Sequence, residues 1–224
     1  MRRRAKRLRD SGLRAVGIER YTWAALFDLD RKLVDLFHGK RDGVFIELGG
    51  NDGLQQSNTL ALSRLYGWKG LLVEADPELA AECRTNRRES VVICAGAGAT
   101  WGAAELDRLD LTGSITQTAD PEATDSPALP TSAAADRVVI ITAPLSDLID
   151  AAGIGSDIDL LSLDVEGYEL PVLAGLDLER HAPTHILVET SQLEAVTEAL
   201  APHYTWIAQW SYHDHLFSRT SDIS

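Results

Sequence analysis

The sequence predicts an α/β protein with a doubly wound, mostly parallel seven-stranded sheet that ends in a C-terminal antiparallel hairpin. Two observations carry this prediction. Short apolar runs alternate with segments of helical periodicity from residue 43 to about residue 200, which is typical of parallel strands joined by helices. The last two strand-like runs, 204–210 and 214–220, are separated only by the residues SYH, which favours a hairpin.

The first half of the chain shows the alternation clearly. Residues 22–38 place large apolar side chains at helical spacing, and Pro77 suits the first turn of a later helix. In chain order we expect a helix over 22–38, a strand over 43–48, a helix over 57–66, a strand over 69–75, a helix over 77–88 and a strand over 91–95.

The second half is interrupted and then regular again. Residues 112–135 are rich in Ala, Thr, Ser, Asp and Pro, and we expect a mobile loop or lid there. After it we expect a strand over 137–143, a helix near 145–152, a strand over 158–164, a helix ending near Gly175, a strand over 185–190 and a helix to about Leu200.

Bulk properties limit the function classes. The chain has 224 residues, of which 45% are hydrophobic, and a formal net charge of −13. We expect one domain over 43–224, preceded over 1–42 by a basic arm and a capping helix. The acidity argues against nucleic-acid binding. No apolar run is long enough for a transmembrane segment, no signal core follows the basic residues, and Cys83 and Cys94 form no CxxC pair, so we expect a cytoplasmic protein.

Acidic residues stand at the ends of four predicted strands: Glu47, Glu74, Asp164 and Glu189. Ligands of open parallel sheets bind outside these strand ends. A row of carboxylates there needs a cation or many hydrogen-bond donors between its members. S-adenosylmethionine, with a sulfonium, an ammonium and a ribose diol, meets that need.

The stretch VFIELGGNDG (44–53) suggests how such a ligand would be held. Gly49 and Gly53 would let the backbone approach it, Glu47 or Asp52 would face the ammonium, and Glu74 would accept hydrogen bonds from the ribose. A nicotinamide-dependent oxidoreductase is the competing interpretation, but it predicts G-x-G-x-x-G, and the third glycine is missing at that spacing.

Three stretches resemble the FkbM family of S-adenosylmethionine-dependent methyltransferases: ELGGNDGLQQSNT, GWKGLLVEADP and IDLLSLDVEGYELPVLAGL. The resemblance runs from about residue 43 to residue 190, and DHLF is similar to the family's closing strand. It implies a Rossmann-like class I methyltransferase fold and O-methylation of a sugar, glycan or glycosylated metabolite.

The resemblance also implies a set of cofactor-binding residues. For the methionine part they are Glu47, Gly49, Asn51, Asp52 and Gly53; for the ribose, Glu74 with Ala75; for the same site, Ser57 and Asn58; for adenine, Ala95 and Gly96; and, at the next strand end, Asp164.

Methyl transfer to a hydroxyl needs a general base or a metal that lowers the hydroxyl pKa. Asp164 and Glu189 could share a Mg²⁺. Glu166, His213 and His215 are the other candidate catalytic groups, the two histidines flanking Asp214. The acceptor would be a small molecule or an oligosaccharide. An inactive cofactor-binding module and a homodimer are further readings that the residues leave open.

Overall fold

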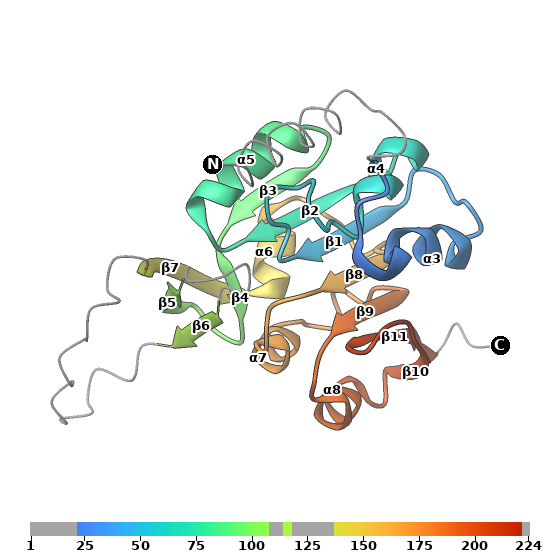
Figure 1. Ribbon diagram of the computed structural model, residues 1–224. Coiled ribbons are helices and arrows are strands. Elements are labelled where there is room, and N and C mark those ends of the chain that lie inside the picture. Colours follow the sequence, from blue (N-terminus) through green and yellow to red (C-terminus); the bar gives the residue numbers. More distant parts are fainter. Residues whose placement is uncertain (1–21, 108–113, 118–136, 221–224) are drawn as a thin grey trace, which may run out of the picture.

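The structure, a computed structural model, describes residues 22–107, 114–117 and 137–220 (Figure 1). The expected arm over 1–21 and most of the expected 112–135 loop lie outside these ranges, while residues 114–117 within that loop form a strand. The helices are η1 (Leu26–Asp28), α3 (Leu29–Leu36), α4 (Leu60–Tyr66), α5 (Pro77–Asn86), α6 (Leu145–Ala151), α7 (Glu169–Ala174) and α8 (Leu193–Leu200).

The expected seven-stranded sheet is confirmed, with the order β10-β11-β9-β8-β1-β2-β3. The pairs among β1, β2, β3, β8 and β9 are parallel, whereas β11 pairs antiparallel with both β9 and β10. The strands are β1 (Val44–Leu48), β2 (Lys69–Glu74), β3 (Val91–Cys94), β8 (Leu160–Leu163), β9 (His185–Glu189), β10 (Tyr204–Gln209) and β11 (Asp214–Arg219).

Helices cover both faces of this sheet (Figure 1). On one face, α3, α4 and α5 pack on a core that includes Phe45, Leu72 and Leu160. On the other face, α6, α7 and α8 pack on a larger core that includes Ile46 and Leu161. Neighbouring residues of one strand therefore serve opposite faces, as the two-residue period of a strand requires. This doubly wound arrangement places the parallel strand ends along one edge.

Residues 137–143 do not extend the main sheet. They lie in β7 (Arg137–Pro144), which belongs to a second sheet of order β4-β7-β5-β6. Its other strands are β4 (Gly96–Gly98), β5 (Gly102–Asp107) and β6 (Ser114–Gln117). Buried and exposed residues alternate in the middle of β7, with Ile140 buried and Val139 and Ile141 exposed. A strand with one buried and one exposed face suits a small sheet that is covered on one side. A central strand of the main sheet would be covered on both sides.

The helix expected over 22–38 is shorter than its apolar pattern. Helix α3 begins only at Leu29, because Phe27 and Asp28 adopt left-handed backbone conformations. The buried Asp30 carboxylate accepts hydrogen bonds from the Ala24 and Ala25 N–H groups, at 2.7 and 3.1 Å. This acceptor holds the preceding segment in an extended path and stops the helix there.

Two further features bear on the sequence predictions. Cys83 is buried, Cys94 is half-buried, and both are free thiols. Within the described ranges, none of the helices has the length and apolar character needed to cross a bilayer. The cytoplasmic location stays a prediction.

Candidate active site

Glu47 lies one residue before the end of β1, and the segment that follows the strand wraps over its carboxylate. The Asn58 N–H donates to Oε1 at 2.8 Å, Ser57 Oγ donates to Oε2 at 3.0 Å, and Thr59 Oγ1 also donates to Oε2. Because these donors are used here, α4 begins at Leu60 and not at Ser57. Glu47 is buried among them, so its carboxylate anchors the loop to β1.

Arg87 supplies the positive charge for this cluster. Its side chain follows α5 and is fully buried, with Nη1 3.6 Å from Glu47 Oε2. The guanidinium also donates to Ser57 Oγ at 3.1 Å, to Thr59 Oγ1 at 3.0 Å and to the Gly53 carbonyl oxygen at 3.3 Å. The Arg87 side chain, from the residue after α5, thus ties β1 to the loop over 49–59. Sequence reasoning missed Arg87, because an arginine at a helix end ordinarily reads as a surface charge.

The glycines of the loop are required by close approach of protein atoms. Gly49 has φ 76°, and a Cβ added there would lie 2.1 Å from the Asp164 carbonyl oxygen. Gly53 has φ 79°, and its added Cβ would lie 2.7 Å from Cγ of Arg87. The positive φ angles and these contacts both exclude larger residues. The side on which a Cβ would stand is therefore occupied by the Asp164 carbonyl group at Gly49 and by the Arg87 side chain at Gly53.

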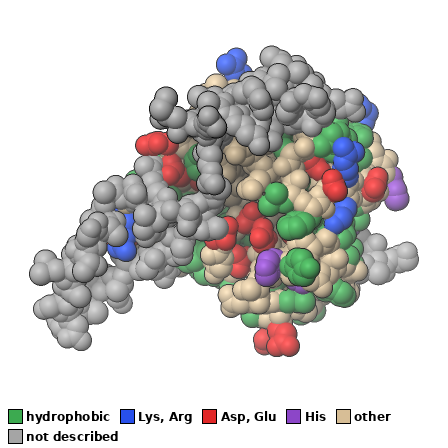
Figure 2. Space-filling model, viewed as in Figure 1, with side chains coloured by type: hydrophobic (Ala, Val, Ile, Leu, Met, Phe, Trp, Pro, Cys, Tyr) green, Lys and Arg blue, Asp and Glu red, His purple; other side chains and the backbone are tan. Residues whose placement is uncertain are grey.

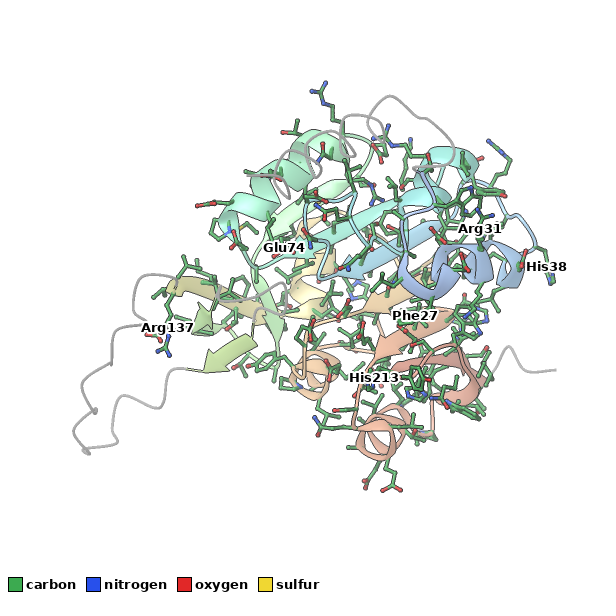
Figure 3. The ribbon with its side chains drawn as sticks, in the orientation of Figure 1. Phe27, Arg31, His38, Glu74, Arg137 and His213 are labelled. Atoms are coloured by element: carbon green, nitrogen blue, oxygen red, sulfur yellow. The ribbon has the colours of Figure 1, made fainter. Side chains whose placement is uncertain are left out.

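Glu74 ends β2 and faces the same loop (Figure 3). Its carboxylate accepts the Asn51 N–H at 2.7 Å and the Asp76 N–H at 2.8 Å. Burial nevertheless raises the pKa of Glu74 to about 7. A carboxylate offers about four acceptor positions, so Glu74 can take further donors such as the hydroxyls of a ribose. This feature fits the nucleoside part of S-adenosylmethionine.

Asp52 completes the loop internally, as its Oδ1 accepts the N–H groups of Leu54 and Gln55 at 2.9 and 2.7 Å. Asn58 Nδ2 reaches Ser162 Oγ on β8 at 3.0 Å. The proposed adenine flank lies where the two sheets meet. Ala95 is buried in the larger core, Gly96 begins β4, and Ala75 packs against the small core of the second sheet.

A second group of carboxylates stands at the ends of β8, β9 and β11. Asp164 follows β8, Glu189 ends β9 and pairs in register with Asp214 of β11, and Glu166 lies in the turn after Asp164. Strand alternation puts Asp164, Glu189 and Asp214 on the sheet face that carries α3, α4 and α5. Figure 2 shows acidic side chains gathered near the middle of the viewed face, beside a histidine. We call Asp164, Glu166, Glu189 and Asp214 the acidic cluster.

Burial and the repulsion between neighbouring carboxyl groups raise pKa values in the acidic cluster. Burial raises the pKa of Asp164 to about 8, and the charge of Glu189 is the next largest cause. Burial, followed by the charges of Asp214 and Glu166, also raises the pKa of Glu189. The contact between the two carboxyl groups acts to raise the pKa of Asp164 and to lower that of Glu189, so Asp164 is the one that keeps a proton more readily. Two carboxyl groups in such contact titrate as a pair.

The structure separates the two candidate histidines. His213 is exposed at the hairpin turn (Figure 3), and its charge lowers the pKa of Glu189. His215 is buried on the opposite face of β11 from Asp214, the face that carries Phe217, and its Nδ1 lies 3.4 Å from the Trp206 indole nitrogen. Burial lowers the pKa of His215. Of the two, only His213 lies beside the acidic cluster.

For a metal ion, the described part of the chain holds no group of three or more His, Cys, Asp and Glu side chains arranged as ligands. Asp164 and Glu189 would supply two carboxylates, but the raised pKa of Asp164 disfavours the ionised form that a metal needs. The residues present therefore fit a pair of carboxyl groups that binds a proton better than they fit a magnesium site.

The sequence profile of the methyltransferase FkbM domain matches residues 47–217, which include the Glu47 loop, Glu74 and the acidic cluster. The chain belongs to the FkbM methyltransferase family. This FkbM domain is accordingly a methyltransferase that depends on S-adenosylmethionine. No curated protein sequence matches the chain significantly.

Solved structures similar to this FkbM domain are distant. A TehB-like S-adenosylmethionine-dependent methyltransferase from Corynebacterium glutamicum is 14% identical, with 97% of each chain covered and a TM-score of 0.47. A precorrin-6y C5,15-methyltransferase from Geobacter metallireducens is 13% identical, with 84% of each chain covered and a TM-score of 0.45. Similarity at this level says nothing about the acceptor of the FkbM domain.

Proposed function

We propose that this FkbM domain transfers a methyl group to a hydroxyl of a sugar, glycan or glycosylated metabolite. The observation that carries the proposal is the placement of Asp164 and Glu189 at the ends of the paired strands β8 and β9, on the edge where parallel-sheet ligands bind. An alcohol is a weak acid, so its methylation needs a group that takes the proton in the transition state. The ionised member of this pair is suited to that task.

The two halves of the edge divide the work. Glu74 would accept the ribose hydroxyls, and the backbone of residues 49–53 would lie beside the methionine part. S-adenosylmethionine, when bound, supplies a methyl group activated by a sulfonium. The acceptor hydroxyl would donate to Glu189, and the proton would pass to the carboxyl pair as the new C–O bond forms and the C–S bond breaks, leaving the electron pair on sulfur.

A positive charge near the acidic cluster would lower the pKa of Asp164 and release its proton. Binding of the sulfonium donor would therefore prepare the pair to act as a base. A neutral donor product lacks that charge. The carboxylates of the acidic cluster repel one another in the free protein. A bound cationic donor would offset this repulsion, and the neutral product would not.

A carbohydrate acceptor is favoured by the chemistry of the cluster. Carboxylates accept hydrogen bonds from hydroxyl groups and repel phosphates. The same repulsion argues against a nucleic-acid acceptor.

Binding and transfer can be tested separately. Calorimetry with S-adenosylhomocysteine should show binding at one site, and transfer of a labelled methyl group should then be screened over sugars, glycolipids and a nucleotide panel. We expect label on a sugar hydroxyl and undiminished transfer in EDTA. Binding without transfer to any sugar would contradict the acceptor class, and loss of transfer in EDTA would contradict the assignment of the carboxyl pair as a metal-free base.

A further inference from the structure

Glu169 is the first residue of α7 and lies behind the acidic cluster. Its side chain is buried, with 2% of the residue exposed. Oε1 accepts the Gly167 N–H at 2.7 Å, and Oε2 lies 3.4 Å from Thr190 Oγ1. One carboxylate therefore contacts the turn after β8 and the residue after β9. The sequence analysis assigned no role to this residue, although it belongs to the stretch DVEGYE.

The turn that Glu169 contacts has an unusual backbone. Glu166 has φ 51° and Gly167 has φ 92°, so two consecutive residues are left-handed. For Glu166 this conformation is strained, and it persists only where neighbouring groups hold it. The Glu169 carboxylate, which accepts the Gly167 N–H, is such a group. It keeps Glu166 in the turn next to Asp164.

The contact with Thr190 reaches the other strand of the cluster. Thr190 directly follows Glu189, and its N–H donates to the His213 carbonyl oxygen at 2.8 Å. Thr190 Oγ1 in addition accepts the Gln192 N–H at 3.0 Å. Thr190 is thus joined to the hairpin, to the start of α8 and, through its hydroxyl, to Glu169. A shift of Thr190 would carry Glu189 with it.

We propose that Glu169 is a positioning residue that fixes Asp164 and Glu189, at the ends of the neighbouring strands β8 and β9, relative to each other. Glu169 is enclosed by protein and does not itself touch the acceptor. This inference rests on the proposed function, since it assigns a support to the proposed base. The groups facing the pair are Glu166 from the β8 turn and Asp214 and His213 from the hairpin.

The test compares Glu169→Ala and Glu169→Gln. In Glu169→Ala the turn loses its acceptor, and we expect the turnover number for methyl transfer to fall about 10- to 100-fold, because small displacements of reacting groups have effects of this size. The pH midpoint of turnover should move down as the carboxyl groups separate. Glu169→Gln keeps an amide oxygen for the Gly167 N–H, and it should recover most of the turnover number and of the pH midpoint.

Glu194→Gln is the matched control, because Glu194 is also an acid in the first turn of a helix, α8, but is exposed. It corrects for the loss of a favourable charge at a helix N-terminus. Affinity for S-adenosylhomocysteine should change less than threefold in all three variants. An unchanged pH midpoint and turnover number in Glu169→Ala would overturn the proposal.

Two measurements keep the inference testable on its own. If Glu169→Ala does not fold, Thr190→Val removes only the hydroxyl contact and should produce the same direction of change, about two- to fivefold in turnover. The pH dependence of thermal unfolding needs no acceptor, and Asp164 and Glu74 both contribute to it, so the change from wild type in Glu169→Ala reports the effect on Asp164. A Glu169→Ala protein with the wild-type pH dependence would refute the positioning role even if the acceptor class were wrong.

Discussion

Glu47 and Asp164 lie near the ends of adjacent parallel strands, yet the protein surrounds them in opposite ways. Glu47 accepts from Ser57, Asn58 and Thr59 and is paired with the buried Arg87. Asp164 faces Glu189, Glu166 and Asp214, and its pKa is raised. The comparison teaches that a carboxylate at a strand end is structural where donors enclose it, and available for chemistry where other carboxylates face it.

The largest expected effect concerns the environment of Asp164. Asp164→Asn keeps the shape of the side chain but removes the acid from the pair, so the turnover number for methyl transfer should fall about 10²- to 10⁴-fold. Affinity for S-adenosylhomocysteine, measured by calorimetry, should change little. Asp177→Asn, at an exposed carboxylate away from the edge, is the control. Turnover within threefold of wild type would remove Asp164 from the site.

The next largest effect concerns the environment of Glu47. Arg87→Met leaves Glu47 buried without its cation, and the free energy of unfolding should fall by about 3–5 kcal/mol. Urea denaturation followed by circular dichroism measures this loss. Arg180→Met is the comparison, because Arg180 also pairs with carboxylates but at the surface, and its loss should be much smaller. Equal losses in the two variants would contradict the assigned environment of Glu47.

The environment of Glu74 is intermediate between those of Glu47 and Asp164, because its carboxylate accepts two backbone N–H groups and its pKa is raised. Glu74→Gln should weaken S-adenosylhomocysteine binding about tenfold, because charge-assisted hydrogen bonds to the ribose are lost. The acceptor KM should stay within about twofold. The exposed Glu82 of α5 provides the control variant, Glu82→Gln. An unchanged affinity for the nucleoside product would show that the ribose is held elsewhere.

The smallest effect is a pH dependence of stability. The pKa values of Asp164 and Glu74 are raised in the folded protein, so at pH values between the pKa values of these groups in the unfolded and in the folded protein, the folded state binds more protons than the unfolded state. Stability therefore falls as the pH rises through that interval. Between about pH 6 and about pH 8 the Tm should decrease on the order of a few degrees. Asp164→Asn should flatten the dependence, and an equally steep curve in that variant would contradict the assignment.

The sequence predicted the main sheet well because its strands are buried on both faces and read as apolar runs. It also located the strand-end acids, since acids directly after such runs stand out. It missed the second sheet, because 137–143 has the same apolar composition as a central strand and only its pairing with 102–107 reveals the difference. It likewise missed Arg87 and Glu169, whose partners lie far away along the chain or are backbone groups.

By itself the sequence determined the alternation of strands and helices, the family, and the row of acids at one edge. Periodicity and local motifs encode these features directly. Only the tertiary structure decided which acids are enclosed by donors, which face other acids and have raised pKa values, and which histidine stands beside them. The reason is physical: the state of a carboxyl group depends on the charges and donors within a few ångströms, and those come from segments that the fold alone brings together.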